Sequence, residues 1–304
     1  MFFLFSLSMF CQEENVVKDY YKENFVVRAF DYSKQHYFAR LSYNNQTIYT
    51  TNRLHPSKRI IILSNTNNGV KTLAFSNDEN FLISGTITGK LEVWDINKRT
   101  LVKTISLHNK AINKLKFLSQ EAFFISAGND GKIFLVDFQE TQKSKLIGNH
   151  EGIVRDFDVS DDNSFLVSIG SDNKLIIWDL NEFKKIKSTI IRSARPTSVK
   201  FVPNSKSILV GDSMGNLLLL DGNLDVTNKI NIHKDILSKI CAFSENIIYT
   251  SSFDGSIKKI DLKDFKLKNV YSNKSYIINM VIKDDILTFS NRNGELISKK
   301  IEPK

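Results

Sequence analysis

The sequence predicts an all-β fold in which four-stranded repeats close into a ring. Aspartates that follow a large apolar residue recur about every 42 residues. Short apolar runs bounded by Asn, Asp, Ser and Gly fill each period, and such runs are typical of strands joined by turns. The chain also contains 22 Phe and 9 Tyr, which suit the pleated surface of a sheet. A period of this length indicates a repeat architecture.

Three series of residues share the period. The aspartates are separated by 42, 42, 42 and 40 residues and are Asp95, Asp137, Asp179, Asp221 and Asp261. A turn residue precedes each of them by six positions, in a series made of Gly89, Gly131, Asn173, Gly215 and Gly255 and continued by Gly294. The third series is His108, His150 and His233. Three series in phase indicate that the repeats are copies of one structural unit.

The repeat of residues 150–191 shows what each unit contains. Strands are expected over residues 153–159, 165–169, 174–179 and 184–191, with polar turns between them. Four consecutive antiparallel strands form one blade of a β-propeller.

The chain resembles the WD-repeat family over roughly residues 65 to 300. The best copy has His150, Ser168, Asp172 and Trp178-Asp179. Two further copies have His108, Ser126 and Asp130 with Val136 in the Trp position, and His233, Ser251 and Asp254 with Ile260 there. The repeats that start near residues 65, 195 and 274 lack the His or the turn Asp. The resemblance implies that Asp172, His150, Ser168 and Trp178 form a hydrogen-bonded chain that makes the blade rigid.

We predict seven four-stranded blades within residues 13–304. Residues 25–64 form a cryptic first blade, and residues 65–273 hold the clear repeats. Residues 274–304 supply three strands of a closing blade, and residues 13–21 supply the fourth. Closure by both ends of the chain removes open sheet edges. The alternative is a six-bladed ring with residues 13–64 as an extension.

The sequence predicts no catalytic residues, no metal site and no cofactor. An Asp-His-Ser set resembles the composition of a hydrolase triad, but here it recurs at the repeat period and is interpreted as structural. His36 and His55 have no Cys or Asp cluster at ligand spacing. The repeat positions offer no cluster of ionisable residues for the central channel. The alternative is an exported propeller enzyme, or a propeller that binds a small ligand in an unrecognised central-channel site.

The expected function is non-catalytic: a scaffold that binds a protein or peptide. Net charge is +9 and dispersed, without an aromatic and basic module, so nucleic acid is an unlikely partner. First-to-second turns are mainly acidic, whereas the opposite end of the ring is rich in Lys and Arg. We therefore place the partner site on that basic end, at Lys110, Arg195, Phe253 and Arg292, and expect an acidic partner. Binding along the circumference or at the acidic end is the competing hypothesis.

The first eleven residues read MFFLFSLSMFC and are followed by Gln12-Glu13-Glu14. The length of this apolar run fits the apolar region of a secretory signal, although no basic residue precedes it. Residues 1–12 are therefore interpreted as a signal peptide, which gives a secreted or periplasmic protein; the alternative location is cytoplasmic. No apolar run approaches the roughly 18 residues that span a bilayer.

We predict that residues 1 to about 12 are removed during export, because a signal peptide is cleaved from the mature protein. The mass of the intact protein isolated from its native host tests this. A full-length mature chain would favour the cytoplasmic location.

Overall fold

The computed structural model describes residues 16–19, 30–32, 37–41, 48–52, 55–63, 69–119, 122–283 and 285–301. Of the side chains before residue 69, those of Phe30 and Asp31 are described. The predicted signal peptide at residues 1–12 lies outside these ranges. The described part of the chain is made of strands and one 3-10 turn, η1 (Thr141–Lys143), without an α-helix.

The strands pair into seven antiparallel four-stranded sheets, which we number as blades in chain order. Blade 1 comprises β2 (Phe30–Tyr32), β3 (Tyr37–Leu41), β4 (Ile48–Asn52) and β5 (His55–Leu63). Blade 2 comprises β6 (Val70–Phe75), β7 (Phe81–Thr86), β8 (Lys90–Asp95) and β9 (Thr100–Ser106). Blade 3 comprises β10 (Ile112–Phe117), β11 (Phe123–Gly128), β12 (Lys132–Asp137) and β13 (Lys145–Asn149).

Blade 4 comprises β14 (Val154–Val159), β15 (Phe165–Gly170), β16 (Lys174–Asp179) and β17 (Lys184–Ile190). Blade 5 comprises β18 (Pro196–Phe201), β19 (Ile208–Asp212), β20 (Asn216–Leu220) and β21 (Val226–Asn231). Blade 6 comprises β22 (Leu237–Ala242), β23 (Ile247–Ser252), β24 (Ser256–Asp261) and β25 (Leu267–Ser272). Blade 7 comprises β26 (Ile277–Lys283), β27 (Ile286–Asn291), β28 (Leu296–Lys300) and β1 (Val16–Asp19).

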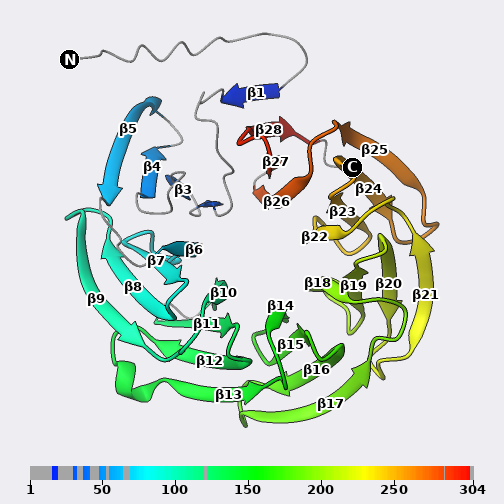
Figure 1. Cartoon of the computed structure of the whole chain (residues 1–304), viewed down its shortest axis with the longest axis horizontal. Helices are drawn as coiled ribbons and strands as arrows, with labels where there is room; N and C mark the ends of the chain where they lie inside the picture. The colour runs from blue at the N-terminus through cyan, green and yellow to red at the C-terminus, as the bar shows by residue number, and fades with distance from the viewer. Residues whose placement is uncertain are drawn as a thin grey trace.

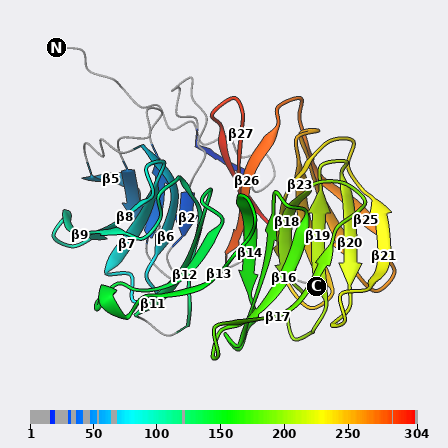
Figure 2. The same ribbon diagram turned by 60° about the horizontal axis from the view of Figure 1, so that its bottom comes forward.

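The blades stand around an open centre, with the first strand of each blade innermost and the last outermost (Figure 1). First strands of neighbouring blades contact each other from β2 of blade 1 through to β26 of blade 7. Each blade is an antiparallel meander, so its second-to-third turn and its connection to the next blade lie at one end of the ring, the loop end. First-to-second turns lie at the other end, the turn end, and the strands run between the two (Figure 2).

The ring is closed by strands from both ends of the chain. β1 pairs antiparallel with β28, from Val16 opposite Lys299 to Asp19 opposite Leu296. The pairing gives blade 7 its fourth strand from within residues 13–21, and β2 to β5 form a sheet within residues 25–64. The all-β propeller of four-stranded blades predicted from the sequence is confirmed. The pairing gives seven sheets, whereas the six-bladed alternative required residues 13–64 to lie outside the ring.

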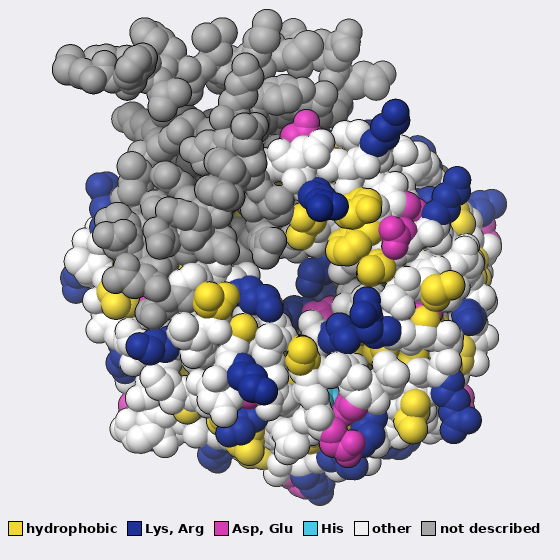
Figure 3. Space-filling model, in the orientation of Figure 1, with side chains coloured by type: hydrophobic (Ala, Val, Ile, Leu, Met, Phe, Trp, Pro, Cys, Tyr) yellow, Lys and Arg dark blue, Asp and Glu magenta, His cyan; other side chains and the backbone are white. Residues whose placement is uncertain are grey.

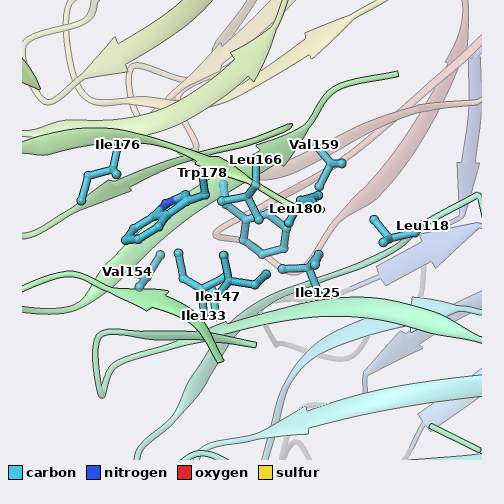
Figure 4. Packing of buried hydrophobic residues seen from close by; sticks show 12 residues of the cluster. Leu118, Ile125, Ile133, Ile147, Val154, Val159, Leu166, Ile176, Trp178 and Leu180 are labelled. Atoms are coloured by element: carbon cyan, nitrogen blue, oxygen red, sulfur yellow. The ribbon is translucent and has the colours of Figure 1, made fainter. Parts of the chain in front are cut away.

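The hydrophobic core lies between blades rather than within them. One cluster joins Ile125 and Ile133 of blade 3 to Phe157, Leu166 and Trp178 of blade 4, all almost completely buried (Figure 4). Equivalent clusters fill each junction from blade 2 to blade 7. Blades 3 to 6 are therefore covered on both faces. This explains why their strands are rich in apolar residues and do not alternate strictly between apolar and polar residues.

Gly148 on β13 provides a test of this packing, because its backbone lies directly against the indole of Trp178 and a Cβ there would overlap the ring. Overpacking a filled core typically costs about 1–3 kcal/mol. We predict that Gly148→Ala lowers the free energy of unfolding by this amount in chemical denaturation. Gly222→Ala is the control, since the atom nearest to its added Cβ is Cβ of Lys206 at 3.3 Å. Equal stability of the two variants would contradict the packing at this junction.

Candidate functional site

The polar chain implied by the repeat sequence is present in blade 4. Nδ1 of His150 lies 3.0 Å from one carboxylate oxygen of Asp172, and Nε2 lies 2.8 Å from Oγ of Ser168. Nε1 of Trp178 donates to the same Oγ at 2.8 Å. Backbone N–H groups of Glu151 and Lys174 also donate to Asp172. The chain thus ties the second-to-third turn of blade 4 to the connection that enters the blade.

This arrangement is structural rather than nucleophilic. Ser168 has no exposed surface, and its hydroxyl lies between the imidazole and the indole. Burial opposes ionisation of Asp172, but the neighbouring His150 and the backbone donors outweigh it and lower the pKa of the carboxyl. Burial also lowers the pKa of His150. Because the hydrogen bonds of the Asp172 carboxylate are satisfied, this network makes the turn rigid.

Blades 3 and 6 repeat the chain with changes. In blade 3, His108 bonds Asp130 at 2.9 Å and Ser126 at 3.0 Å. Val136 stands in the Trp position there, so the chain of blade 3 has no indole donor. In blade 6, Nε2 of His233 lies 2.9 Å from Oγ1 of Thr250.

The match of Ser251 to this position was therefore wrong. The spacing from His to the turn Asp is one residue shorter in blade 6, and a one-residue shift moves a strand side chain to the other face of its sheet. Ser251 pairs instead with Ser238 at 2.9 Å.

The buried histidines give a testable dependence on pH. Burial lowers the pKa of His233 from 6.5, its value in an unfolded chain, to about 4. The nearby Asp254 acts in the opposite direction but does not outweigh burial. Between these values the unfolded chain binds a proton that the folded protein does not, so stability falls as the pH decreases. We predict a loss of about 2 kcal/mol from His233 alone between neutral pH and pH 5.

The measurement is the free energy of unfolding against pH for the wild-type protein and for His233→Asn. The variant should show a shallower fall toward low pH. The remaining fall comes from His108 and His150, whose pKa values burial also lowers. Parallel curves for the two proteins would show that His233 is not held neutral.

The central channel holds a cluster of charges that the sequence analysis missed. Nζ of Lys114 lies 2.6 Å from Asp156, and Nζ of Lys239 lies 4.0 Å from the same carboxylate oxygen. Asp156 also accepts hydrogen bonds from Oγ of Ser198 at 3.0 Å and from N–H of Val199 at 3.1 Å. The four blades from 3 to 6 are thereby connected through one carboxylate.

A second layer has the same construction. Asp158 accepts from Nζ of Lys116 at 2.7 Å and from Nζ of Lys200 at 3.1 Å. Burial opposes ionisation of Asp158, but the surrounding lysines lower the pKa of its carboxyl strongly. For Lys114 the balance is reversed, because burial outweighs Asp156 and lowers the pKa of the ammonium group.

These residues occupy equivalent places on successive first strands. The expectation that the channel lacks ionisable residues was wrong because Lys, Asp and Ser alternate at these places and no single residue type recurs there. The signal appears only when the first strands are aligned, which brings Lys114, Asp156, Ser198 and Lys239 into one column.

Each first strand from blade 2 to blade 7 also begins with a β-bulge at one place. A bulge re-aims a side chain. In blade 4 the bulged residue is Arg155, whose Nε is buried and has no hydrogen-bond partner among the described residues. Burial and the charge of Arg195 both lower the pKa of this guanidinium. Arg195 directly precedes β18, the first strand of blade 5, which contacts β14.

The structure brings two of the four predicted partner-binding residues together. The ring of Phe253 is stacked on the ring of Tyr276, with centroids 5.4 Å apart and an angle of 8° between the planes. The guanidinium of Arg292 lies over the ring of Tyr276, 5.4 Å from its centroid. We call these three residues the aromatic stack. Tyr276 was missed, although it occupies the same repeat position as Arg195, directly before a first strand.

The other two predicted residues lie elsewhere on the loop end. Lys110 and Arg195 are exposed on the connections that enter blades 3 and 5, and no contact among the described side chains joins either of them to the aromatic stack. Figure 3 shows one end of the ring, where Lys and Arg side chains and hydrophobic side chains lie along the described part of the rim of the central opening. Exposed apolar side chains on loop-end turns are Ile87, Ile153, Met214 and Tyr276.

Within the described ranges, no group of three or more His, Cys, Asp or Glu is placed to hold a metal ion. The same ranges contain no helix of the length and apolarity that crossing a membrane requires.

Comparison with known proteins agrees with this architecture. Residues 31–120 match the model of the anaphase-promoting complex subunit 4 WD40 domain, and residues 141–179 match the model of the WD domain, G-beta repeat. Among solved structures, a chain in "Crystal Structure of Mitotic Checkpoint Complex" is similar with a TM-score of 0.83 and 15% identity, over 97% of this chain and 95% of that one. The search of curated proteins gives no match. With its repeat period, its Asp–His–Ser–Trp chain and its ring of four-stranded blades, the protein belongs to the WD-repeat β-propellers.

Proposed function

We propose that the protein is a non-catalytic scaffold that binds an acidic protein or peptide on the loop end of the ring. The observation that carries this proposal is the aromatic stack of Phe253, Tyr276 and Arg292. Tyr276 is 38% exposed and Phe253 is half-buried, so two flat rings and a guanidinium are presented together at the surface. Aromatic residues and arginine are the residue types most often responsible for binding energy at protein interfaces.

The surroundings of the aromatic stack support a protein partner. Ile87, Ile153 and Met214 occupy turns at the same end and are exposed by 55%, 37% and 64%. Exposed apolar residues on rigid loops supply the buried centre of an interface, while charged residues form its rim. The similar solved chain comes from a structure whose title names a complex, which agrees with a scaffold role.

The charge of the loop end favours an acidic partner. Lys110, Arg192, Arg195, Lys234 and Arg292 are exposed there. Glu151, an exposed acidic residue at this end, is already paired with Lys174 at 2.6 Å. Complementary charge mainly speeds encounter and selects partners.

Some acidic side chains at the turn end already accept hydrogen bonds from within the ring. Asp161 accepts from N–H of Asn204, and Oε1 of Glu245 accepts from Nδ2 of the same Asn204. These contacts join the first-to-second turns of blades 4, 5 and 6. They leave the loop end as the surface better suited to a partner.

We predict that Phe253→Ala and Arg292→Glu weaken binding of the partner roughly tenfold or more, because truncation of an interface anchor costs about 2 kcal/mol. The partner is first captured from extract of the native host with the full chain. Affinity and its salt dependence are then measured for each variant. Arg195→Glu is expected to act in the same direction, mainly through a slower association rate.

Lys185→Glu on β17 is the matched control, because this lysine is exposed on the outermost strand of blade 4 and does not lie at the loop end. The reversals Asp161→Lys and Asp162→Lys test the turn end. If these two weaken binding while the loop-end variants bind as the wild type does, the partner uses the turn end and the proposed face is wrong.

A further inference from the structure

The charges on four of the first strands that line the central channel are not balanced among themselves. The first strands β10, β14, β18 and β22 carry four lysines and one arginine but two aspartates. Each aspartate already has two lysines within 4.0 Å, so the two carboxylates are shared among all four lysines. Charges taken out of water are costly unless they are paired, and this wall therefore has an excess of partly buried positive charge.

The best place for a compensating anion is beside Asp156, toward the loop end. Lys239 has the longest contact in the cluster, with its Nζ 4.0 Å from Asp156, whereas Lys114 is at 2.6 Å. Asp156 is preceded on β14 by the bulged Arg155, whose buried Nε has no hydrogen-bond partner among the described residues.

A second arginine, Arg195, directly precedes β18, the first strand of blade 5, and β18 contacts β14, the strand that carries Arg155. Two adjacent guanidinium groups repel each other unless an anion lies between them. Guanidinium groups present paired N–H donors that match the oxygens of phosphate. Figure 3 shows an opening at the centre of the ring, with Lys and Arg side chains prominent along the described part of its rim, so a small solute has access to it.

We propose that the central channel binds a small oxyanion of the phosphate class, held by Arg155 and Arg195 at its entrance and by Lys239 inside. The free anion, and not an acidic side chain of the protein partner, is the occupant, because Arg155 and Lys239 lie on inner strands below the loops. The site shares Arg195 with the proposed partner surface but does not include Phe253, Tyr276 or Arg292, so variants at Arg155 and Lys239 test it separately from the proposed function. In the alternative in which the propeller binds a small ligand in its central channel, this proposal identifies that ligand as a phosphate-like anion.

The test is isothermal titration of the full chain with inorganic phosphate, in a phosphate-free buffer whose ionic strength is kept constant with sodium chloride. Lys239→Met and Arg155→Met remove one donor each. Both variants should fold, because Asp156 keeps Lys114 and Ser198 and because Nε of Arg155 has no protein partner to lose. Each should weaken phosphate binding roughly tenfold, the effect of losing one charge-assisted hydrogen bond.

Lys185→Met is the matched control and should bind phosphate as the wild type does, since this lysine is exposed on the outermost strand of blade 4. Near-ultraviolet circular dichroism verifies that each variant is folded. A hexaglutamate peptide is titrated in parallel as the carboxylate source. The proposal is overturned if phosphate produces no saturable heat, if both channel variants bind it like the wild type, or if the peptide alone binds in a manner that depends on Arg155.

Discussion

The pairing of β1 with β28 is the constraint on which the rest of this structure depends. Each junction from blade 2 to blade 7 is filled by a cluster of buried side chains, so these blades are stable only with neighbours on both faces. A repeat unit of this kind cannot bury its apolar faces alone. Because the last three strands of the chain need a fourth, the strand from residues 16–19 fixes both the number of blades and the position of the first one.

Closure also determines which residues meet in the centre. Since every blade presents its first strand inward, residues separated by one period become neighbours across a blade junction. Lys116, Asp158 and Lys200 are each 42 residues apart and form one bridged layer. Asp156 and its two lysines form the next layer. The charges thus connect blades at the inner strands, while apolar clusters connect them farther out.

Much of the fold follows from the sequence because one physical unit is repeated. The spacing of His150, Ser168, Asp172 and Trp178 contains enough information to place a turn, a loop and two strands. The match failed at Ser251, where a loop one residue shorter changed the face of the strand and brought Thr250 to the histidine instead. Period counting is therefore accurate for turns, where Gly and Asp recur, and less accurate inside strands, where a single deletion reverses the pattern.

The candidate site was harder to predict for a different reason. Phe253 and Arg292 were identified from their turn positions, but the residue that joins them, Tyr276, lies on another connection, and only the folded ring shows that the three are stacked. The channel lysines were missed because their partners are aspartates one period away, so their pairing is a property of the ring and not of any one repeat.

The position of the polar chains explains why the loop end is suited to recognition. Asp172, Asp130 and Asp254 hold second-to-third turns there by hydrogen bonds to a buried histidine and to backbone N–H groups of the entering connection. Loops fixed in this way lose little conformational freedom when a partner binds, so more of the contact energy remains as affinity. Rigidity that originates in buried histidines is thus expressed in the loops at the surface.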